Sequence, residues 1–245
     1  MRKTNSIVLC TLLVLFFSGC VVVNFTDADA VSGKGTPEKY VINVSEYNGI
    51  NVEGLCEIQY YAMPSNTVTL EIQSNLREYF VVEVQNGVLI ARTTKRINYN
   101  SGKAPVLSVS TPTLNSLTIK GICAFKGNDR IKADTFTLEI NGGAGEGKTE
   151  LDVNSLKASI SGAGIFELSG KADNAEIKFS GAGELKAFSL QMREASVDFS
   201  GAGAIRISCS EKLSVEARGA GTVEYKGSPI LSLNTRGAVR IRKAD

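Results

Sequence analysis

The stretch that decides the fold is residues 159–187, SISGAGIFELSGKADNAEIKFSGAGELKA, because it holds two copies of one pattern. In each copy, a Ser-Gly-Ala-Gly segment lies between two short runs in which apolar and polar residues alternate. Alternation with a period of two is typical of a β-strand that has one side in the core and the other in water. The two copies therefore indicate a repeated unit of strand, tight corner and strand.

The same corner recurs along the C-terminal half of the chain. Gly-Ala-Gly segments begin at Gly143, Gly162, Gly181, Gly201 and Gly219 and end at Gly145, Gly164, Gly183, Gly203 and Gly221. A Gly-Ala-Val variant begins at Gly237. Successive corners are 18 to 20 residues apart. A single unit cannot bury its apolar side alone, whereas stacked units can, so the repeat predicts a solenoid. We expect an all-β, right-handed parallel β-helix with about 18–20 residues per coil, in which glycine lets the backbone turn sharply beside the next corner.

The N-terminal half is β-rich but less regular. Alternating segments predict strands at 41–44, 68–72, 81–84 and 88–91, Asn86-Gly87 predicts a turn, and residues 76–80 predict one helical turn. We expect residues 37–120 to form an N-terminal β-rich part with irregular coils, and residues 121–245 to form the regular repeats. Cys56 and Cys123 fall in the slot that Gly164 takes in a later unit. Residues 55–120 would then be coils with longer excursions or a separate β-rich cap.

The first 19 residues resemble a lipoprotein signal peptide. Arg2 and Lys3 precede a short apolar run that ends in small residues followed by Cys20. This run is too short to span a bilayer. We expect Cys20 to carry the lipid and residues 20–36 to tether the fold to the membrane; an ordinary signal peptide with a chance cysteine is the alternative.

Composition excludes several kinds of chemistry. The chain has no His and no Trp, which removes the Ser-His-Asp triad, Cys-His pairs and His-ligated zinc. Loss of Arg2 and Lys3 with the signal would leave 25 basic and 25 acidic residues, so nucleic-acid binding has no electrostatic basis. Three cysteines would remain besides the lipidated one, without CxxC spacing, which argues against a disulfide framework or a metal site.

Two rows of outward side chains are the candidates for a site. One row is Ser159, Lys178, Asp198, Glu216 and Asn234, and the other is Glu167, Lys186, Arg206 and Glu224. Asp198 and Glu216 should lie in successive coils, with Cα atoms about 5 Å apart. Carboxylates so close would suit glycoside hydrolysis. A solvated face stabilised by opposite charges and a shared binding surface are the alternatives.

The glycine-rich corners and their serines have simpler interpretations than catalysis. A phosphate-binding loop needs a following helix, and here a strand follows each Gly-Ala-Gly. The serines that precede the corners, Ser161, Ser180 and Ser200, have no base near them in the pattern and suit turns. The charged C-terminal residues 240–245 would keep the last coil from stacking on another molecule, or would form a basic recognition tail.

The chain resembles the family of the putative auto-transporter adhesin, head GIN domain. The resemblance is carried by the lipobox-like segment, by Gly49-Ile50-Asn51, and by the serial Gly-Ala-Gly corners, and it covers roughly residues 40–240. It implies a β-helix like that of pectin lyases on a secreted or surface lipoprotein. It supplies no catalytic residues.

These observations favour a non-catalytic, lipid-anchored protein of the cell envelope, at the outer membrane, that binds a polysaccharide or protein ligand. A polysaccharide lyase or hydrolase and an envelope assembly component with a protein partner are the alternatives. We expect no cofactor and no metal. The aromatic side chains that a binding face would expose are Tyr60, Tyr61, Tyr79, Tyr99 and Tyr225.

Overall fold

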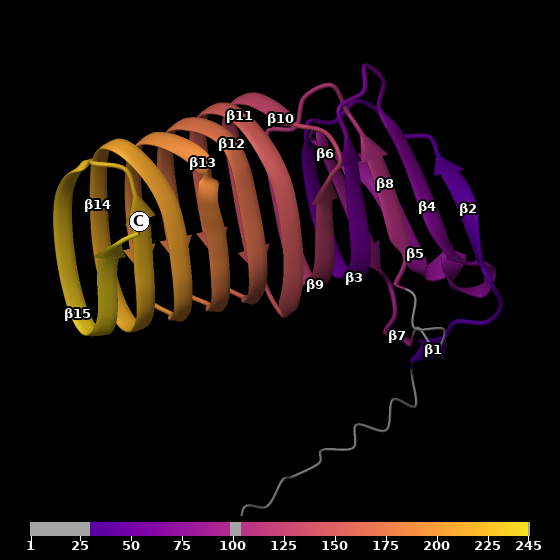
Figure 1. The fold of residues 1–245 in the computed structure, drawn as a ribbon. Coiled ribbons are helices and arrows are strands. Elements are labelled where there is room, and N and C mark those ends of the chain that lie inside the picture. The colour runs from indigo at the N-terminus through magenta and orange to yellow at the C-terminus, as the bar shows by residue number, and fades with distance from the viewer. Residues whose placement is uncertain (1–29, 99–103, 245) are drawn as a thin grey trace, which may run out of the picture.

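The computed structural model describes residues 30–98 and 104–244, and in them the chain is a parallel β-solenoid of about six turns (Figure 1). The predicted signal peptide, the lipidated Cys20 and Tyr99 lie outside these residues. The prediction of an all-β solenoid is confirmed. Its handedness and its likeness to pectin lyases stay predictions.

The regular coils stack in the order of the sequence. Their strands are β9 (Ser116–Gly127), β10 (Ile131–Asn141), β11 (Ala144–Ile160), β12 (Ala163–Phe179), β13 (Ala182–Phe199), β14 (Ala202–Lys226) and β15 (Ile230–Lys243). Each strand from β10 onward pairs in parallel with the next one. Equivalent residues of the repeat therefore lie side by side, as the sequence pattern predicts.

The core is a continuous column of inward side chains. At one position of the repeat, Ile160, Phe179 and Phe199 are in register on β11, β12 and β13, and all three are buried. The rings of Phe179 and Phe199 stack with their centroids 5.8 Å apart. Apolar residues stabilise the fold only because each coil covers the next one.

The corners contain glycine mainly because stacked backbones approach closely there. At Gly183, an added Cβ would lie 2.1 Å from the carbonyl oxygen of Gly164, and at Gly203 it would lie 2.0 Å from that of Gly183. The backbone of these two glycines is not in the left-handed region, whereas Gly219 has a φ of 117°. Close approach, more than an unusual turn, thus selects glycine at most corners.

The sheet of the solenoid continues into an N-terminal cap. The first coil is β3 (Gly49–Tyr61), which pairs with β9 over its whole length. The chain between β3 and β9 adds two strands in parallel to the free side of β3, and further strands that are antiparallel to those two. These elements, with the two strands before β3, are β1 (Val31–Ser32), β2 (Pro37–Ile42), β4 (Thr67–Gln73), the 3-10 helix η1 (Ser74–Tyr79), β5 (Phe80–Gln85), β6 (Val88–Thr93), β7 (Ile97–Asn98) and β8 (Val106–Ser110).

The cap extends the sheet from both the start and the end of β3. The start of β3 pairs with β6, which forms a hairpin with β5, and the end of β3 pairs with β8, which leads to β4 and β2. The expected turn at Asn86-Gly87 closes that hairpin, with positive φ at both residues. The expected helical turn is η1. The strands of the cap therefore belong to the same sheet as the coils.

Part of the predicted tether is attached to the fold. Within residues 20–36, β1 pairs in parallel with β7, and the amide of Lys34 donates a hydrogen bond to the Asn75 side chain. Among the described residues, no helix has the length and hydropathy needed to cross a membrane.

Candidate ligand-binding face

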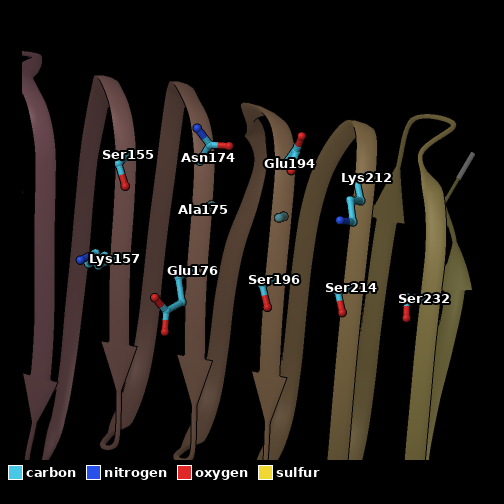
Figure 2. Close-up of a pocket in the computed structure, with 11 residues that line it drawn as sticks. Ser155, Lys157, Asn174, Ala175, Glu176, Glu194, Ser196, Lys212, Ser214 and Ser232 are labelled. Carbon is cyan, nitrogen blue, oxygen red and sulfur yellow. The ribbon is translucent and has the colours of Figure 1, made fainter.

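A long polar groove of about 600 Å³ runs across β11 to β15 on one side of the solenoid (Figure 2). We call it the polar groove, and it is lined by Ser155, Lys157, Asn174, Ala175, Glu176, Glu194, Ala195, Ser196, Lys212, Ser214 and Ser232. The groove crosses the strands, so each of these strands contributes one to three side chains. Such a site is elongated, because its length is set by the number of coils that it crosses.

The period of two places these side chains on the surface. In β11, Ser155 and Lys157 face outward, whereas Leu156 between them is fully buried. The strand register then repeats both positions in every coil. One row is Ser155, Asn174, Glu194 and Lys212, and the other is Lys157, Glu176, Ser196, Ser214 and Ser232.

Two small residues occupy the middle of the groove. Ala175 and Ala195 take the inward position that Leu156 and Leu213 take in the neighbouring coils. Both alanines are nearly buried, with 6% and 5% of their surface exposed, yet they line the groove. The short side chains bring the groove close to the backbone at its centre.

Most polar groups of the groove are free to meet a ligand. Within the described part of the chain, Ser155, Asn174, Ser196, Ser214 and Ser232 make no side-chain hydrogen bond, and Lys157, Glu194 and Lys212 form neither a hydrogen bond nor an ion pair. Hydroxyl, amide, ammonium and carboxylate groups thus alternate along the groove, and among its charged residues Glu176 forms an ion pair with Lys178, outside the groove. Serine and asparagine hydroxyl and amide groups both donate and accept hydrogen bonds, as the hydroxyl groups of sugars do.

The first predicted row lies beside the groove, at the next outward position of each strand. Its register is as expected, with Lys178 next to Asp198 and Asp198 next to Glu216. The ammonium group of Lys178 lies 2.9 Å from a carboxylate oxygen of Glu176, which ties this row to the groove. The ion pair lowers the pKa of Glu176 and raises that of Lys178.

The expected carboxylate pair is bridged by an arginine. Asp198 and Glu216 are in-register neighbours, and the Arg218 guanidinium lies 3.9 Å from the first and 2.9 Å from the second. Both carboxylates are therefore engaged in ion pairs with Arg218. Such a pair suits charge balance on a surface, whereas a general acid needs a carboxyl group that keeps its proton.

The second predicted row lies beyond the Gly-Ala-Gly corner and not in the groove. Lys186 and Arg206 are in register, and Arg206 donates to Glu224 over 2.8 Å and also pairs with Glu184. Glu224 is not the exposed residue that we expected, because its side chain is only 10% exposed. Hydrogen bonds from Arg242 and Arg206 lower its pKa. This row is a structural ladder of ion pairs.

A second surface feature is an apolar patch on the first coils. Leu55, Ile122 and Ile165 form this apolar patch, and they are 38%, 53% and 42% exposed. A groove of about 430 Å³ is lined by all three, and a neighbouring one of about 470 Å³ includes Ile165 with Glu57.

The candidate aromatic residues that the structure describes are all buried or partly buried. Tyr60 was expected to be exposed and is fully buried, because it follows Cys56 and Ile58 in the inward phase of β3. Tyr61, Tyr79 and Tyr225 are partly buried. Among the described residues, no cluster of His, Cys, Asp or Glu could hold a metal ion.

The polar groove itself is not among the sites predicted from the sequence. Lys157, Glu176, Ser196, Ser214 and Ser232 each lie five residues before the first glycine of a corner, one outward step before the row that was chosen. The same alignment of corners contains this signal. What it does not contain is the depression at Ala175 and Ala195, which depends on how two neighbouring coils fill the core.

Comparison with known proteins places this architecture in a family. Three crystal structures share the fold: a putative adhesin from Bacteroides fragilis (22% identity, TM-score 0.79), a putative adhesin from Parabacteroides merdae (20%, 0.70) and a putative lipid binding protein from Parabacteroides distasonis (22%, 0.69). They cover 88%, 89% and 89% of this chain, and in each case the whole of the other chain. No curated protein matches at a significant level. The family model of the putative auto-transporter adhesin, head GIN domain, matches residues 46–229, and the chain belongs to this family.

Proposed function

We propose that this protein is a lipid-anchored adhesin of the outer cell envelope that binds an extended polysaccharide along the polar groove, without catalysis. The observation that carries the proposal is the groove itself, in which free hydroxyl, amide and charged groups recur from coil to coil. Membership of an adhesin family supports an exported, cell-surface protein. Lipidation at Cys20 would keep the solenoid at the membrane.

The repeat suits a polymer better than a small molecule. Adjacent coils are about 4.8 Å apart, so the groove offers similar groups at a regular spacing along the solenoid axis. A chain of similar sugar units can then meet one coil after another, and many weak contacts add to a useful affinity. The bridged state of Asp198 and Glu216 and the lowered pKa of Glu176 support binding rather than hydrolysis.

Blocking the groove tests the proposal. We expect Ser196→Tyr and Ser214→Tyr to fold normally, since both serines face outward on strands and Tyr favours strands. Each should weaken binding to the best ligand of a polysaccharide array at least tenfold. Ser189→Tyr, on an exposed serine of β13 that does not line the groove, is the matched control. If the wild type, the two groove variants and the control variant all bind the ligand equally well, the polar groove is not the binding site.

The anchor needs its own experiment. We expect the full-length protein to fractionate with the membrane and to incorporate labelled fatty acid. Cys20→Ser should abolish both results. Fatty-acid labelling that survives in the Cys20→Ser protein would contradict lipidation at this residue.

A protein partner in envelope assembly is the second candidate function, and the apolar patch favours it. Exposed apolar side chains in one place are typical of protein-binding surfaces. Crosslinking in the native membrane should then capture one defined protein, and Ile122→Lys should abolish the crosslink while leaving glycan binding unchanged. A polysaccharide array without any hit, together with such a crosslink, would favour this function over adhesion to glycans.

A further inference from the structure

The first two coils carry a pair of thiols that the proposed function does not use. Cys56 of β3 and Cys123 of β9 are in-register neighbours on adjacent parallel strands. Their Sγ atoms lie 3.6 Å apart, and each residue is 2% exposed. Both thiols are free in this structure. The later coils have glycine at this slot, so the two cysteines are a departure from the repeat at the coils that join the cap.

The geometry is compatible with a covalent bond between the two sulfur atoms. Adjacent strands lie about 4.8 Å apart, which falls within the Cα separations of about 4.4–6.8 Å that disulfides span. The sulfur atoms must approach to about 2.05 Å, a movement that rotation of two side chains can supply. On the other side of Cys123, the next coil brings Gly145, which has no side chain, against its carbonyl oxygen.

The two thiols also differ from Cys209 in that they line a surface groove, and the pKa of Cys123 is shifted in the opposite direction from that of Cys209. Cys56 and Cys123 both line the groove of about 430 Å³ at the apolar patch, and since each is only 2% exposed, an oxidant would reach them when this edge of the solenoid opens locally. A hydrogen bond with Cys56 lowers the pKa of the Cys123 thiol. Cys209 instead bonds to the carbonyl oxygens of Arg193 and Lys212, and burial raises its pKa.

We propose that Cys56 and Cys123 form a disulfide that joins the first coil of the solenoid to the second. The oxidant is another disulfide, on a small molecule or on an exchange protein. The Cys123 thiolate attacks one of its sulfur atoms and releases the first thiol. Cys56, on losing its proton, then attacks the sulfur of Cys123 and releases the second thiol. One S–S bond replaces two S–H bonds in this protein, and the oxidant is reduced to two thiols.

The disulfide would hold the base of the cap. The two cysteines are 67 residues apart in sequence, and β4, η1 and β5 to β8 lie between them. A link at this point closes the loop that carries most of the cap, and constraining a long loop stabilises the folded state.

Peptide mapping of the full-length protein tests this inference. The protein is reduced, incubated with oxidised glutathione, alkylated in denaturant and digested with trypsin, while a small dithiol in the same buffer reports that the oxidant works. We expect peptide 40–77, which contains Cys56, to be joined to peptide 121–126, which contains Cys123, and peptide 207–212 to carry alkylated Cys209. The oxidised protein should have a Tm about 5 to 15 °C above that of the reduced protein.

Variants separate this disulfide from other effects of oxidation. Cys56→Ser should remove the joined peptide and make Tm independent of the oxidant, whereas the control Cys209→Ser should keep both the joined peptide and the rise in Tm. If peptides 40–77 and 121–126 are recovered fully alkylated although the dithiol is oxidised, the inference is wrong. A joined peptide that contains Cys209 would also overturn it.

Discussion

A single methyl group can show why the corners contain glycine. An alanine Cβ at position 203 would lie 2.0 Å from the carbonyl oxygen of Gly183, in a backbone conformation that alanine otherwise adopts easily. The two coils must therefore separate locally, and we expect Gly203→Ala to lower the free energy of unfolding by about 1–3 kcal/mol. Urea unfolding followed by circular dichroism measures this. Ala202→Ser, at the exposed residue beside it, should leave the midpoint of urea unfolding nearly unchanged. If both variants lost the same free energy of unfolding, the corner would tolerate no change at all.

The ion pairs of Glu224 should make stability depend on pH. Its pKa is lowered in the folded state by Arg242 and Arg206, so the ionised form is favoured by folding. The resulting stabilisation is present above the pKa of the unfolded chain, about 4.3, and is lost as the pH falls through the lower pKa of the folded state. We expect Tm to drop between pH 5 and pH 3, and Glu224→Gln to reduce that drop. Thermal unfolding across this range is the measurement, and an identical pH profile in the variant would refute the assignment.

Single residues also show where reading the sequence succeeds and where it fails. The register of Lys178, Asp198 and Glu216 follows from aligning the corners, because in a parallel stack equal repeat positions become neighbours. The prediction that Tyr60 is exposed is wrong. Tyr60 lies two residues after Ile58 and therefore on the same, inward side of β3, a relation that the sequence already shows. The contact of Glu224 with Arg206 and Arg242 also follows from the alignment, because all three hold the same repeat position; the degree to which the two arginines bury Glu224 does not.

At the scale of elements, each coil is stabilised by the one beside it. Phe179 of β12 and Phe199 of β13 are stacked and buried, so each ring covers the other. We expect Phe199→Ala to cost about 3–5 kcal/mol, and the double variant with Phe179→Ala to cost less than the sum of the single variants by about 0.5–1.5 kcal/mol. Equilibrium unfolding of the four proteins in a double-mutant cycle gives this coupling energy. Additive effects would mean that the stack contributes only buried area.

The cap marks the limit of what repeat analysis can predict. Its strands were recognised one by one, and the turn at Asn86-Gly87 has the backbone that this pair favours. Their pairing was not foreseen, because β4 and β8 are antiparallel neighbours that share no repeat with each other. The cap strands dock where β3 is free to pair, with β6 at its start and β8 at its end. A strand pattern that occurs only once in a sequence has no second copy to be aligned with. The register of its pairing therefore cannot be predicted from an alignment of repeats.

At the scale of the whole molecule, a stack of coils should be least stable where a coil has a neighbour on one side only. Leu231 and Leu233 of β15 are 41% and 46% exposed, whereas Leu213 and Val215 at the same repeat positions of β14 are buried. β15 therefore gains less from burial than the coils inside the stack, and it opens at lower free energy.

Hydrogen exchange should reveal this gradient along the solenoid axis. We expect amides of β15 to exchange first and amides of β12 and β13, which are covered on both sides, to exchange last, because protection follows the free energy of local opening. Exchange followed by mass spectrometry on peptides from each coil measures the order. Leu213→Ala should extend fast exchange from β15 into β14 while β12 stays protected, since the loss of one buried side chain acts mainly on the neighbouring interface. Uniform exchange of all coils, in the wild type and in this variant, would show instead that the solenoid opens only as a single cooperative unit.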